Sequence, residues 1–368
     1  MQRPVWRRRR PNLPPESAAL NDAPASGFAD RVVRWQRGHG RSELPWQNTL
    51  DPYRVWLSEV MLQQTQVSTV LAYFARFLAR FPTVTELAAA PEDEVFGLWS
   101  GLGYYSRARN MHRCAQQVVN RFGGAFPRTA AELETLPGIG RSTAAAIAAF
   151  CFGERVAILD GNVKRVLTRV LGFDADLSVA VNERRLWDEA TALLPAGDSR
   201  KAMSAYTQGL MDLGATVCLA RRPHCMICPI SDLCVGRLQG MPERYPVKSR
   251  QLRRSAQALW MLHARDPAGR VWLEKRPPRG IWAGLYCLPV FASRAALLEA
   301  LPPRPRSAVR DQAPFVHVLT HKDLHLHPVS APCSAGVVVA GAGQWLAAEQ
   351  WAKLGLPAPV RKLLAART

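Results

Sequence analysis

The sequence Leu136-Pro-Gly-Ile-Gly140 separates two stretches with helical character, residues 130–135 and residues 141–151. Two glycines allow a tight turn and leave backbone N–H groups uncovered. The helix that begins beside these donors points the positive end of its dipole toward solvent, where it attracts anions. The pattern therefore predicts a hairpin of two helices that holds the phosphate of one nucleic-acid strand. An ordinary turn between two helices is the alternative, because glycine-rich turns are common.

A carboxylate follows this hairpin in Ile158-Leu-Asp-Gly-Asn-Val163, just before an amphipathic helix. Apolar residues at positions 163, 166, 167, 170 and 171 form one face of that helix, and Gly172 is placed to end it. Because the N-terminus of a helix stabilises negative charge, we expect Asp160 to stay ionised. A purely structural helix cap is the alternative role for Asp160.

A second carboxylate lies within an apolar run, Trp56-Leu-Ser-Glu-Val-Met-Leu62. Burial of Glu59 among such neighbours would raise its pKa and suit it to donate a proton. A protonated acid together with an ionised carboxylate is the pair that cleavage of a glycosidic bond requires. The alternative is that Glu59 lies on the polar surface of its helix.

Residues 27–235 have the pattern of an all-α domain. Two segments match the capping box, in which Thr is followed three residues later by Glu: Thr83-Val-Thr-Glu86 and Thr129-Ala-Ala-Glu132. Each follows a turn that contains proline, and each predicts the start of a helix.

The rest of the chain has a different pattern. Residues 236–254 combine glycine, proline and a run of charges, which predicts a linker. Short strands are predicted at residues 258–263, 270–275, 285–290 and 335–340, and a closing helix at residues 358–366. The expected fold class is therefore multidomain, with an all-α domain followed by a smaller α+β domain at residues 255–368.

Four of the eight cysteines, Cys218, Cys225, Cys228 and Cys234, follow the spacing C-x6-C-x2-C-x5-C. Because we see no apolar secretion signal at the N-terminus, a metal centre is favoured over disulfide bonds. Four thiolates suit either tetrahedral zinc or a [4Fe–4S] cluster, and the spacing leaves both open. The other cysteines are scattered, and we expect them to be small core residues.

Composition narrows the class of partner. The chain has 368 residues, and 48 Lys and Arg outnumber 29 Asp and Glu to give a net charge of +19. This surplus favours a polyanion such as nucleic acid. The apolar runs are much shorter than the ~20 residues of a membrane-spanning helix, so we expect no membrane partner. Residues 1–26 contain Arg7–Arg10 and several prolines, which predicts a disordered basic arm.

Together these motifs resemble the helix-hairpin-helix DNA glycosylases of the endonuclease III superfamily. Residues 44–47 (LPWQ), 56–66 (WLSEVMLQQTQ) and 101–105 (GLGYY) narrow the resemblance to the A/G-specific adenine DNA glycosylase (MutY) family, over about residues 28–368. The resemblance implies a [4Fe–4S] cluster rather than zinc. It also implies base-excision repair, in which adenine mispaired with 8-oxoguanine or guanine is removed from double-stranded DNA.

The resemblance also assigns roles in the reaction. Glu59 is implied to protonate adenine at N7, and Asp160 to stabilise the sugar oxocarbenium ion through a transient covalent adduct at C1′. Asn162 is implied to orient the site. These roles require that Glu59 and Asp160 face one cleft.

Further residues are implied to contact DNA while the adenine is flipped out of the helix, as chemistry on a stacked base requires. Gln64, Leu102 and Tyr104 match residues that wedge or stack in the duplex. Apolar wedges and stacking offset the energy of unpairing. Contacts to the backbone are implied for Pro137, Gly138, Gly140, Ser142 and Lys164.

Ser142 separates two subfamilies. Bifunctional relatives carry a Schiff-base lysine in the pattern L-P-G-x-G-x-K, and here Ser142 stands in its place. A hydroxyl is a poor candidate for forming an imine. We therefore expect a monofunctional glycosylase, while a bifunctional enzyme that acts on oxidised pyrimidines and a non-catalytic DNA-binding protein with a metal cluster are the rival functions.

The C-terminal domain resembles the Nudix-like domain of the same family. Its glutamate-rich phosphate-hydrolysing signature is absent from the sequence, so we expect no pyrophosphatase activity. Residues 251–368 contain 16 Lys and Arg against 6 Asp and Glu, which favours contact with DNA. Residues 315–321 align with a loop that recognises 8-oxoguanine, and Thr320 and His321 are its implied contacts. We expect a cytoplasmic bacterial protein that binds DNA as a monomer.

Overall fold

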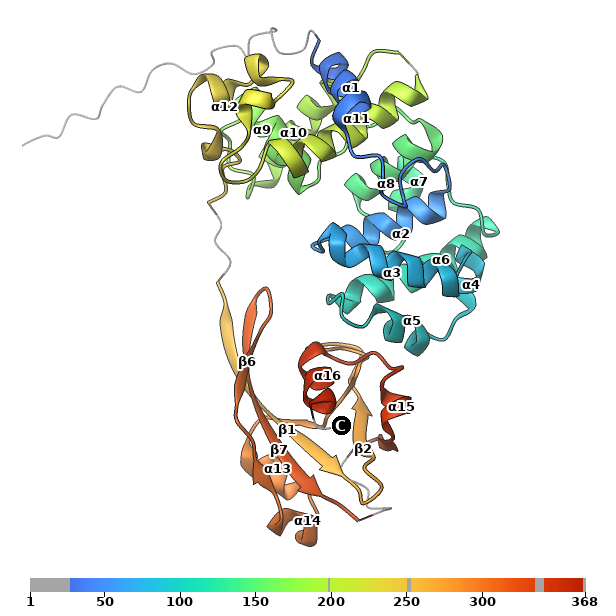
Figure 1. Ribbon diagram of the computed structural model, residues 1–368, viewed down its shortest axis with the longest axis vertical. Coiled ribbons are helices and arrows are strands. Elements are labelled where there is room, and N and C mark those ends of the chain that lie inside the picture. Colours follow the sequence, from blue (N-terminus) through green and yellow to red (C-terminus); the bar gives the residue numbers. More distant parts are fainter. Residues whose placement is uncertain (1–26, 198, 250–252, 335–340, 367–368) are drawn as a thin grey trace, which may run out of the picture.

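The computed structural model describes residues 27–197, 199–249, 253–334 and 341–366. They form two bodies joined by a connecting segment (Figure 1). The first contains helices from α1 (Phe28–His39) to α12 (Val235–Leu238), and the second is a sheet with helices on both faces. This is the predicted class, an all-α domain followed by a smaller α+β domain. The predicted arm at residues 1–26 and strand at residues 335–340 lie outside the described residues.

The helical domain has the expected helix signals. Thr83 and Thr129 each cap a helix, and the capping box at Thr83 is complete. Gly172 ends the amphipathic helix with φ 62°, a left-handed conformation that glycine adopts easily. The remaining helices are α2 (Pro52–Leu62), α3 (Val67–Arg80), α4 (Val84–Ala89), α5 (Glu92–Trp99), α6 (Tyr105–Phe122), α7 (Ala130–Glu134), α8 (Arg141–Ile147), α9 (Gly161–Leu171), α10 (Ala180–Ala192) and α11 (Arg200–Asp212).

The helical domain has two hydrophobic cores, each with its own lobe. The first core takes residues from α2 to α8, including Trp56, Phe77 and Trp99. The second takes residues from α1 and from α9 to the cysteine segment. Helix α8 and the π-helical segment Ala148–Phe152 supply small residues to both cores. Small side chains let the two lobes approach closely along α8 and the π-helical segment. Away from this contact the lobes diverge, and a groove lies between them.

The C-terminal domain is built on two long parallel strands. Strands β1 (Ser255–Arg265) and β7 (Lys322–Pro332) pair over their full length, from Ser255↔Lys322 to Arg265↔Pro332. The sheet order is β3-β2-β1-β7-β5, and β4, β6 and β8 pair with β1, β7 and β2. The shorter strands are β2 (Val271–Lys275), β3 (Tyr286–Cys287), β4 (Val290–Phe291), β5 (Arg310–Asp311), β6 (Phe315–Val318) and β8 (Gly343–Leu346).

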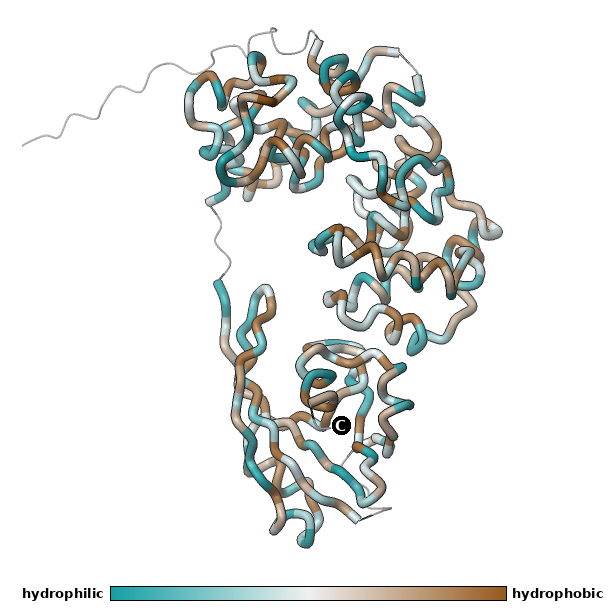
Figure 2. Tube along the Cα trace, viewed as in Figure 1, coloured by the Kyte–Doolittle hydropathy of each residue, from teal (hydrophilic) through white to brown (hydrophobic). Residues whose placement is uncertain are grey.

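Alternation along the strands divides the C-terminal domain into two layers of core. In β1, Leu259 and Met261 pack on one side and Leu262 and Ala264 on the other. Figure 2 shows the alternation of apolar and polar residues along the strands. Helices α15 (Ala348–Trp351) and α16 (Ala358–Ala365) cover the first side, and α13 (Arg294–Glu299) and α14 (Pro303–Ser307) lie on the second.

Two predictions for this part of the chain were wrong. The strand predicted at residues 285–290 is divided into β3, which pairs with β2, and β4, which pairs with β1. Pro289 lies at the break, where its missing N–H could not have continued a ladder. The predicted linker is partly folded: it contains most of α12, and Tyr245 is 3% exposed against the helical domain.

The two domains contact each other through apolar and polar side chains. Leu285 of the C-terminal domain packs into the first core of the helical domain. The hydroxyl of Tyr105 donates to the carbonyl oxygen of Leu356 at 3.1 Å, and Lys275 forms an ion pair with Asp93 at 2.6 Å. This interface fixes where the β6–β7 hairpin lies relative to the helical domain.

Candidate active site

A cleft of about 1330 Å³ lies between the two lobes of the helical domain. Glu59 and Gln64 line it from the first lobe, and Asp160 and Asn162 line it from the second. Pockets for small ligands typically measure roughly 300–1,000 Å³, so this cleft has room for a nucleotide. The structure thus brings together the two carboxylates that the sequence singled out.

Glu59 lies on α2, flanked by the buried Ser58 and Val60. Its burial, and after that the charge of Asp160, raises the pKa of Glu59 to about 8. A carboxyl group with this pKa is mostly protonated at neutral pH. The expected acid character of Glu59 is therefore present, and the apolar run around it is the cause.

Asp160 is the N-cap of α9, and its Oδ1 accepts a hydrogen bond from the Val163 N–H at 2.7 Å. Burial nevertheless raises the pKa of Asp160, against the lowering effect of the backbone donors and of the cation Arg165. The helix N-terminus thus favours the charged form of Asp160, as expected, but its effect is smaller than that of burial. The charge of Asp160 in turn helps to raise the pKa of Glu59.

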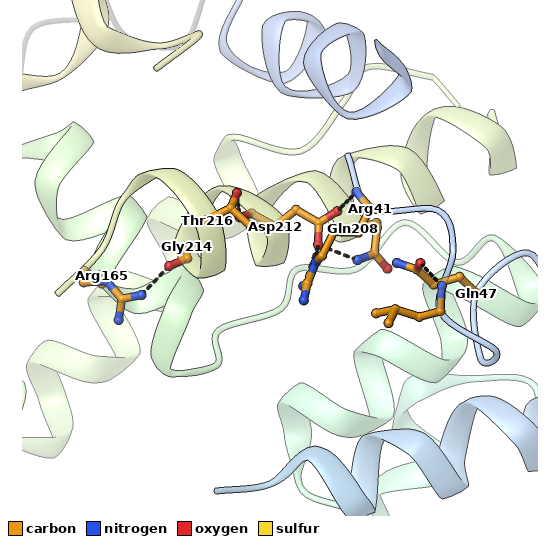
Figure 3. Close-up of polar contacts among 8 residues, drawn as sticks. Arg41, Gln47, Arg165, Gln208, Asp212, Gly214 and Thr216 are labelled. Atoms are coloured by element: carbon orange, nitrogen blue, oxygen red, sulfur yellow. Dashed lines mark hydrogen bonds and ion pairs between the residues drawn. The ribbon is translucent and has the colours of Figure 1, made fainter. Parts of the chain in front are cut away.

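Asn162 is fixed by contacts on two sides. Its Oδ1 accepts from Nη2 of Arg165 at 2.7 Å. The same nitrogen donates to the carbonyl oxygen of Gly214 at 2.6 Å, as Figure 3 shows. Gly214 packs against Asn162 so closely that a Cβ at Gly214 would lie 2.6 Å from the Asn162 Cβ. Glycine is required here by the close approach of two backbones.

The lining of the cleft includes a polar network that we did not predict. Asp212 is 1% exposed, and its carboxylate accepts hydrogen bonds from Arg41 Nε at 2.7 Å and from Gln208 Nε2 at 2.9 Å (Figure 3). Both Arg41 and Gln208 line the cleft. Asp212 follows the apolar Leu210-Met211, so the signal that singled out Glu59 could have found it too.

The expected wedge residues lie on two loops with unusual backbone. Gln64 has φ 57° and Tyr104 has φ 47°, and both side chains are exposed. Leu102, in contrast, is 6% exposed and belongs to the first core. Leu102 is therefore a core residue, and its expected wedge role would require the loop to move.

The hairpin between α7 and α8 has the predicted form. Gly138 has φ 77°, and a Cβ there would lie 2.7 Å from the Asn110 Cβ. Gly140 has an ordinary backbone conformation, and a Cβ there would meet nothing within 4 Å. The turn itself thus requires glycine only at Gly138, while Gly140 leaves open space beside the first residues of α8.

Two further residues are held by contacts within the protein. Ser142 lines the cleft, and its Oγ accepts from the Leu159 N–H at 3.1 Å, which ties α8 to the segment before Asp160. Lys164 forms an ion pair with Glu183. The cation expected to meet a phosphate is therefore paired with a carboxylate of the protein.

Thr320 and His321 form the exposed turn between β6 and β7. The Leu319 N–H donates to the carbonyl oxygen of Lys322 at 2.8 Å and closes this turn. The Thr320 hydroxyl lies 2.8 Å from the Tyr104 hydroxyl of the helical domain. The tip of the C-terminal domain thus touches a loop of the helical domain at one of the expected DNA-contacting residues.

The four clustered cysteines line one small cavity beside α9. Burial raises the pKa of Cys228 to about 12, and the neighbouring cysteines contribute to the shift. Arg169 is 1% exposed, and its Nη1 lies 3.2 Å from the Cys218 Sγ. Four thiols around one cavity with a buried cation beside them fit a cluster whose thiolate ligands give it net negative charge. Cys114, Cys151, Cys287 and Cys333 are buried core residues, as expected.

Comparison with known proteins agrees with these features. The model of the HhH-GPD superfamily of base excision DNA repair proteins matches residues 57–190, that of the iron–sulfur binding domain of endonuclease III residues 218–234, and that of the NUDIX domain residues 260–366. An adenine DNA glycosylase of Buchnera aphidicola is 34% identical over 92% of this chain and 96% of its own. The chain belongs to the adenine DNA glycosylase family.

The human adenine DNA glycosylase matches less of its own length. The human protein is 34% identical over 81% of this chain and 66% of its own. Among solved structures, a thermostable thymine-DNA glycosylase is 27% identical, with a TM-score of 0.51 over 59% of this chain and 97% of its own. Its match covers the extent of the helical domain rather than the whole chain.

As a member of the adenine DNA glycosylase family, the chain is an enzyme of base-excision repair that carries a [4Fe–4S] cluster. Cys218, Cys225, Cys228 and Cys234 are the residues that would hold the cluster, which decides between the two metal centres that the spacing left open. When bound, the cluster would cross-link the loop that packs on α9. Within the part of the chain that the structure describes, no helix has the length and apolarity to cross a membrane.

Proposed function

We propose that this enzyme removes adenine paired with 8-oxoguanine or guanine from double-stranded DNA. The observation that carries the proposal is that Glu59, with a pKa raised to about 8, shares one cleft with Asp160. An acid that is protonated at neutral pH and a neighbouring carboxylate supply the two functions that cleavage of a glycosidic bond requires.

The proposed reaction begins when the adenine nucleotide is flipped into the cleft. Glu59 protonates adenine at N7, the bond between C1′ and N9 breaks, and its electron pair leaves with the base. Asp160 faces the oxocarbenium ion and forms a transient bond to C1′. Water then displaces the Asp160 carboxylate from C1′ and loses a proton to leave an abasic site. Asn162, held by Arg165 and Gly214, keeps this side of the cleft in place.

Polar side chains of the cleft lining would meet the extruded base. Gln208 and Arg41 are two of them, and the buried Asp212 fixes both side chains. A pocket whose polar groups would be left unpaired by the wrong base discriminates more strongly than an apolar pocket of the same shape. The network therefore supports selection of one base over others.

Contacts with DNA are proposed along the same side of the molecule. Gln64 and Tyr104 would stack or wedge in the duplex, and Pro137, Gly138 and Gly140 would present the hairpin to one strand. Thr320 and His321 would meet the opposite strand, where the hydroxyl of Thr320 can donate and accept hydrogen bonds. We propose that the enzyme acts as a monomer and that the C-terminal domain has no pyrophosphatase activity.

A strand-nicking assay tests the substrate. Duplexes that pair A, T or C with 8-oxoguanine, and A with guanine, are incubated with the enzyme and then treated with alkali to cleave abasic sites. We expect cleavage at A opposite 8-oxoguanine and opposite guanine. Equal cleavage of T or C opposite 8-oxoguanine would contradict the proposed substrate.

Borohydride trapping on abasic DNA tests the monofunctional mode. Ser142 replaces the Schiff-base lysine of bifunctional relatives, and its hydroxyl accepts a backbone hydrogen bond. We therefore expect little covalent trapping. Lys201 is the one lysine among the described residues that line the cleft. Strong trapping that disappears in Lys201→Ala would contradict the proposal and assign lyase chemistry to that residue.

A further inference from the structure

Arg107 of α6 connects segments that the proposed function uses separately. Its Nη1 donates to the carbonyl oxygens of Val60 at 3.0 Å and Met61 at 2.9 Å, in the last turn of α2. These carbonyls have no partner within their own helix, and a cation at a helix C-terminus is favourable. Arg107 therefore fixes the C-terminal end of α2. Glu59 lies on this helix, directly before Val60.

The other end of the guanidinium holds the two wedge loops. Nη2 of Arg107 donates to Oγ1 of Thr65 at 3.1 Å and to the carbonyl oxygen of Leu102 at 3.2 Å. Thr65 is the residue after Gln64 on the first wedge loop. Leu102 lies two residues before Tyr104 on the second. Both loops contain left-handed residues, which are strained and need such support.

The same guanidinium is connected to the C-terminal domain. It lies over the Tyr104 ring, with 5.6 Å between Cζ and the ring centroid. The Tyr104 hydroxyl in turn lies 2.8 Å from the Thr320 Oγ1 at the tip of the β6–β7 hairpin. A continuous set of contacts thus runs from the hairpin, through Tyr104 and Arg107, to the α2 end beside Glu59.

We propose that Arg107 is a positioning residue that couples the hairpin tip at Thr320 to the placement of Glu59. When the hairpin meets the base opposite adenine, Tyr104 and the guanidinium carry that contact to the end of α2. This inference rests on the proposed function, because it concerns how the base opposite adenine affects adenine release. A residue that only braced the fold would support excision equally well whatever the opposite base.

The test is a double-mutant cycle on the discrimination ratio, which we define as the single-turnover rate of adenine release opposite 8-oxoguanine divided by the rate opposite guanine. Arg107→Lys keeps the charge but cannot form the forked set of hydrogen bonds. Tyr104→Phe keeps the ring but loses the hydroxyl that reaches Thr320. Arg121→Lys is the matched control, because Arg121 lies on the same helix, is exposed, donates to Gln117 and lies over the Phe122 ring, far from the chain of contacts at Arg107.

We expect each single substitution to lower the discrimination ratio, by about tenfold for a network of contacting residues. The double variant should have a ratio no lower than the lower of the two single variants, because both act on one set of contacts. Arg121→Lys should leave the ratio unchanged. Reductions that multiply in the double variant, or an unchanged ratio in Arg107→Lys, would overturn the coupling.

Two precautions keep the outcome clear. If Arg107→Lys does not fold, Thr65→Val takes its place in the cycle, because it removes the Oγ1 that accepts from Nη2. If the wild-type enzyme releases no adenine from either duplex, it is the proposed function that fails. If the wild type discriminates and the cycle is multiplicative, only the coupling fails.

Discussion

Glu59 and Asp160 are both carboxylates at the edge of one cleft, and their surroundings give them different roles. Glu59 stands in an apolar helix near the charge of Asp160, which together raise its pKa to about 8. Asp160 accepts the Val163 N–H at the start of α9 and has Arg165 close by. The raised pKa suits Glu59 to act as the acid. The N–H donors at the start of α9 suit Asp160 to act as the anion.

The pH dependence of adenine release follows from the raised pKa of Glu59. Only the protonated acid donates, so the single-turnover rate should be highest below about pH 8 and should fall as pH rises through that value. Measurement of the rate between neutral and alkaline pH checks this. A rate that is constant across that range would contradict the acid role.

The same shift predicts a change in stability with pH. A carboxyl whose pKa is raised in the folded state loses stability as pH rises from its unfolded value toward about 8. The free energy of unfolding of the wild type should therefore fall over this window by at most on the order of 1 kcal/mol per pH unit relative to that of Glu59→Gln, and its melting temperature should fall with it. Parallel thermal melts of the two proteins would show no difference if Glu59 had an ordinary pKa.

Gly214 gives a second test at the residue scale. The Cβ of Gly214→Ala would lie 2.6 Å from the Asn162 Cβ and must displace the start of α9. We expect a loss of adenine release of at least about tenfold with the cluster retained, since small displacements in a catalytic site have large effects on rate. Gly240→Ala is the control, because its added Cβ meets nothing within 4 Å, although its φ of 70° imposes some backbone strain. Full activity of Gly214→Ala would show that the close packing is not needed.

At the scale of elements, α9 joins the two functional centres of the helical domain. It begins at Asp160 in the cleft and carries Arg169 against the cysteine loop. Besides the Cys218 Sγ, the Arg169 guanidinium donates to the carbonyl oxygens of Leu219 at 2.6 Å and Ala220 at 3.0 Å. One helix therefore depends on the loop at one end and positions the carboxylate at the other.

Substitution of Arg169→Met should reduce the cluster content of the purified protein. The change removes a buried cation and its donors while keeping a long apolar stem, and breaking such a buried network destabilises by about 3–5 kcal/mol. Iron analysis, visible absorbance and thermal melting measure the effect, with the exposed Arg244→Met as control. Wild-type iron content and melting temperature in Arg169→Met would contradict this account of the loop.

Local signals predicted the elements that depend on local chemistry. The caps at Thr83 and Thr129, the turn at Gly138 and the end of α9 at Gly172 all depend on a few neighbouring residues. The division of residues 285–290 into two strands could not be read in this way, because each half pairs with a different partner strand. The burial of Leu102 likewise depends on packing against distant helices.

At the scale of the whole molecule, the C-terminal domain completes the helical domain. Leu285 fills part of the first core, and Arg109 donates to the carbonyl oxygen of Ala283 across the interface at 2.5 Å. These contacts, together with that of Thr320 and Tyr104, place the hairpin beside the loops of the helical domain (Figure 1).

Deletion of residues 251–368 should therefore have two effects. Adenine release should persist, since the cleft lies wholly within the helical domain, but the preference for 8-oxoguanine over guanine should fall. The melting temperature should also fall, because the deletion uncovers the core around Leu285. Lys275→Ala is the control, because a largely exposed ion pair contributes only about 0–1 kcal/mol. An unchanged preference after deletion would remove the recognition role of the C-terminal domain.

Residues of the candidate site were predictable from sequence only where their neighbours in the sequence give a clear signal. Glu59 in its apolar run, Asp160 before its helix and the four clustered cysteines could be found from sequence. The pairing of Arg41 with Asp212 could not be found from sequence, because the two residues are 171 positions apart and only the fold makes them a pair. Arg107 was missed because five of its acceptor atoms come from three separate segments.

Comparison of the wild type with Glu59→Gln on a duplex containing adenine opposite 8-oxoguanine tests the central claim most directly. Single-turnover adenine release and duplex binding are measured for both proteins. The account predicts that Glu59→Gln binds the duplex as tightly as the wild type and releases adenine at least about a hundredfold more slowly, the usual contribution of a general acid. Adenine release at the wild-type rate by Glu59→Gln would contradict it.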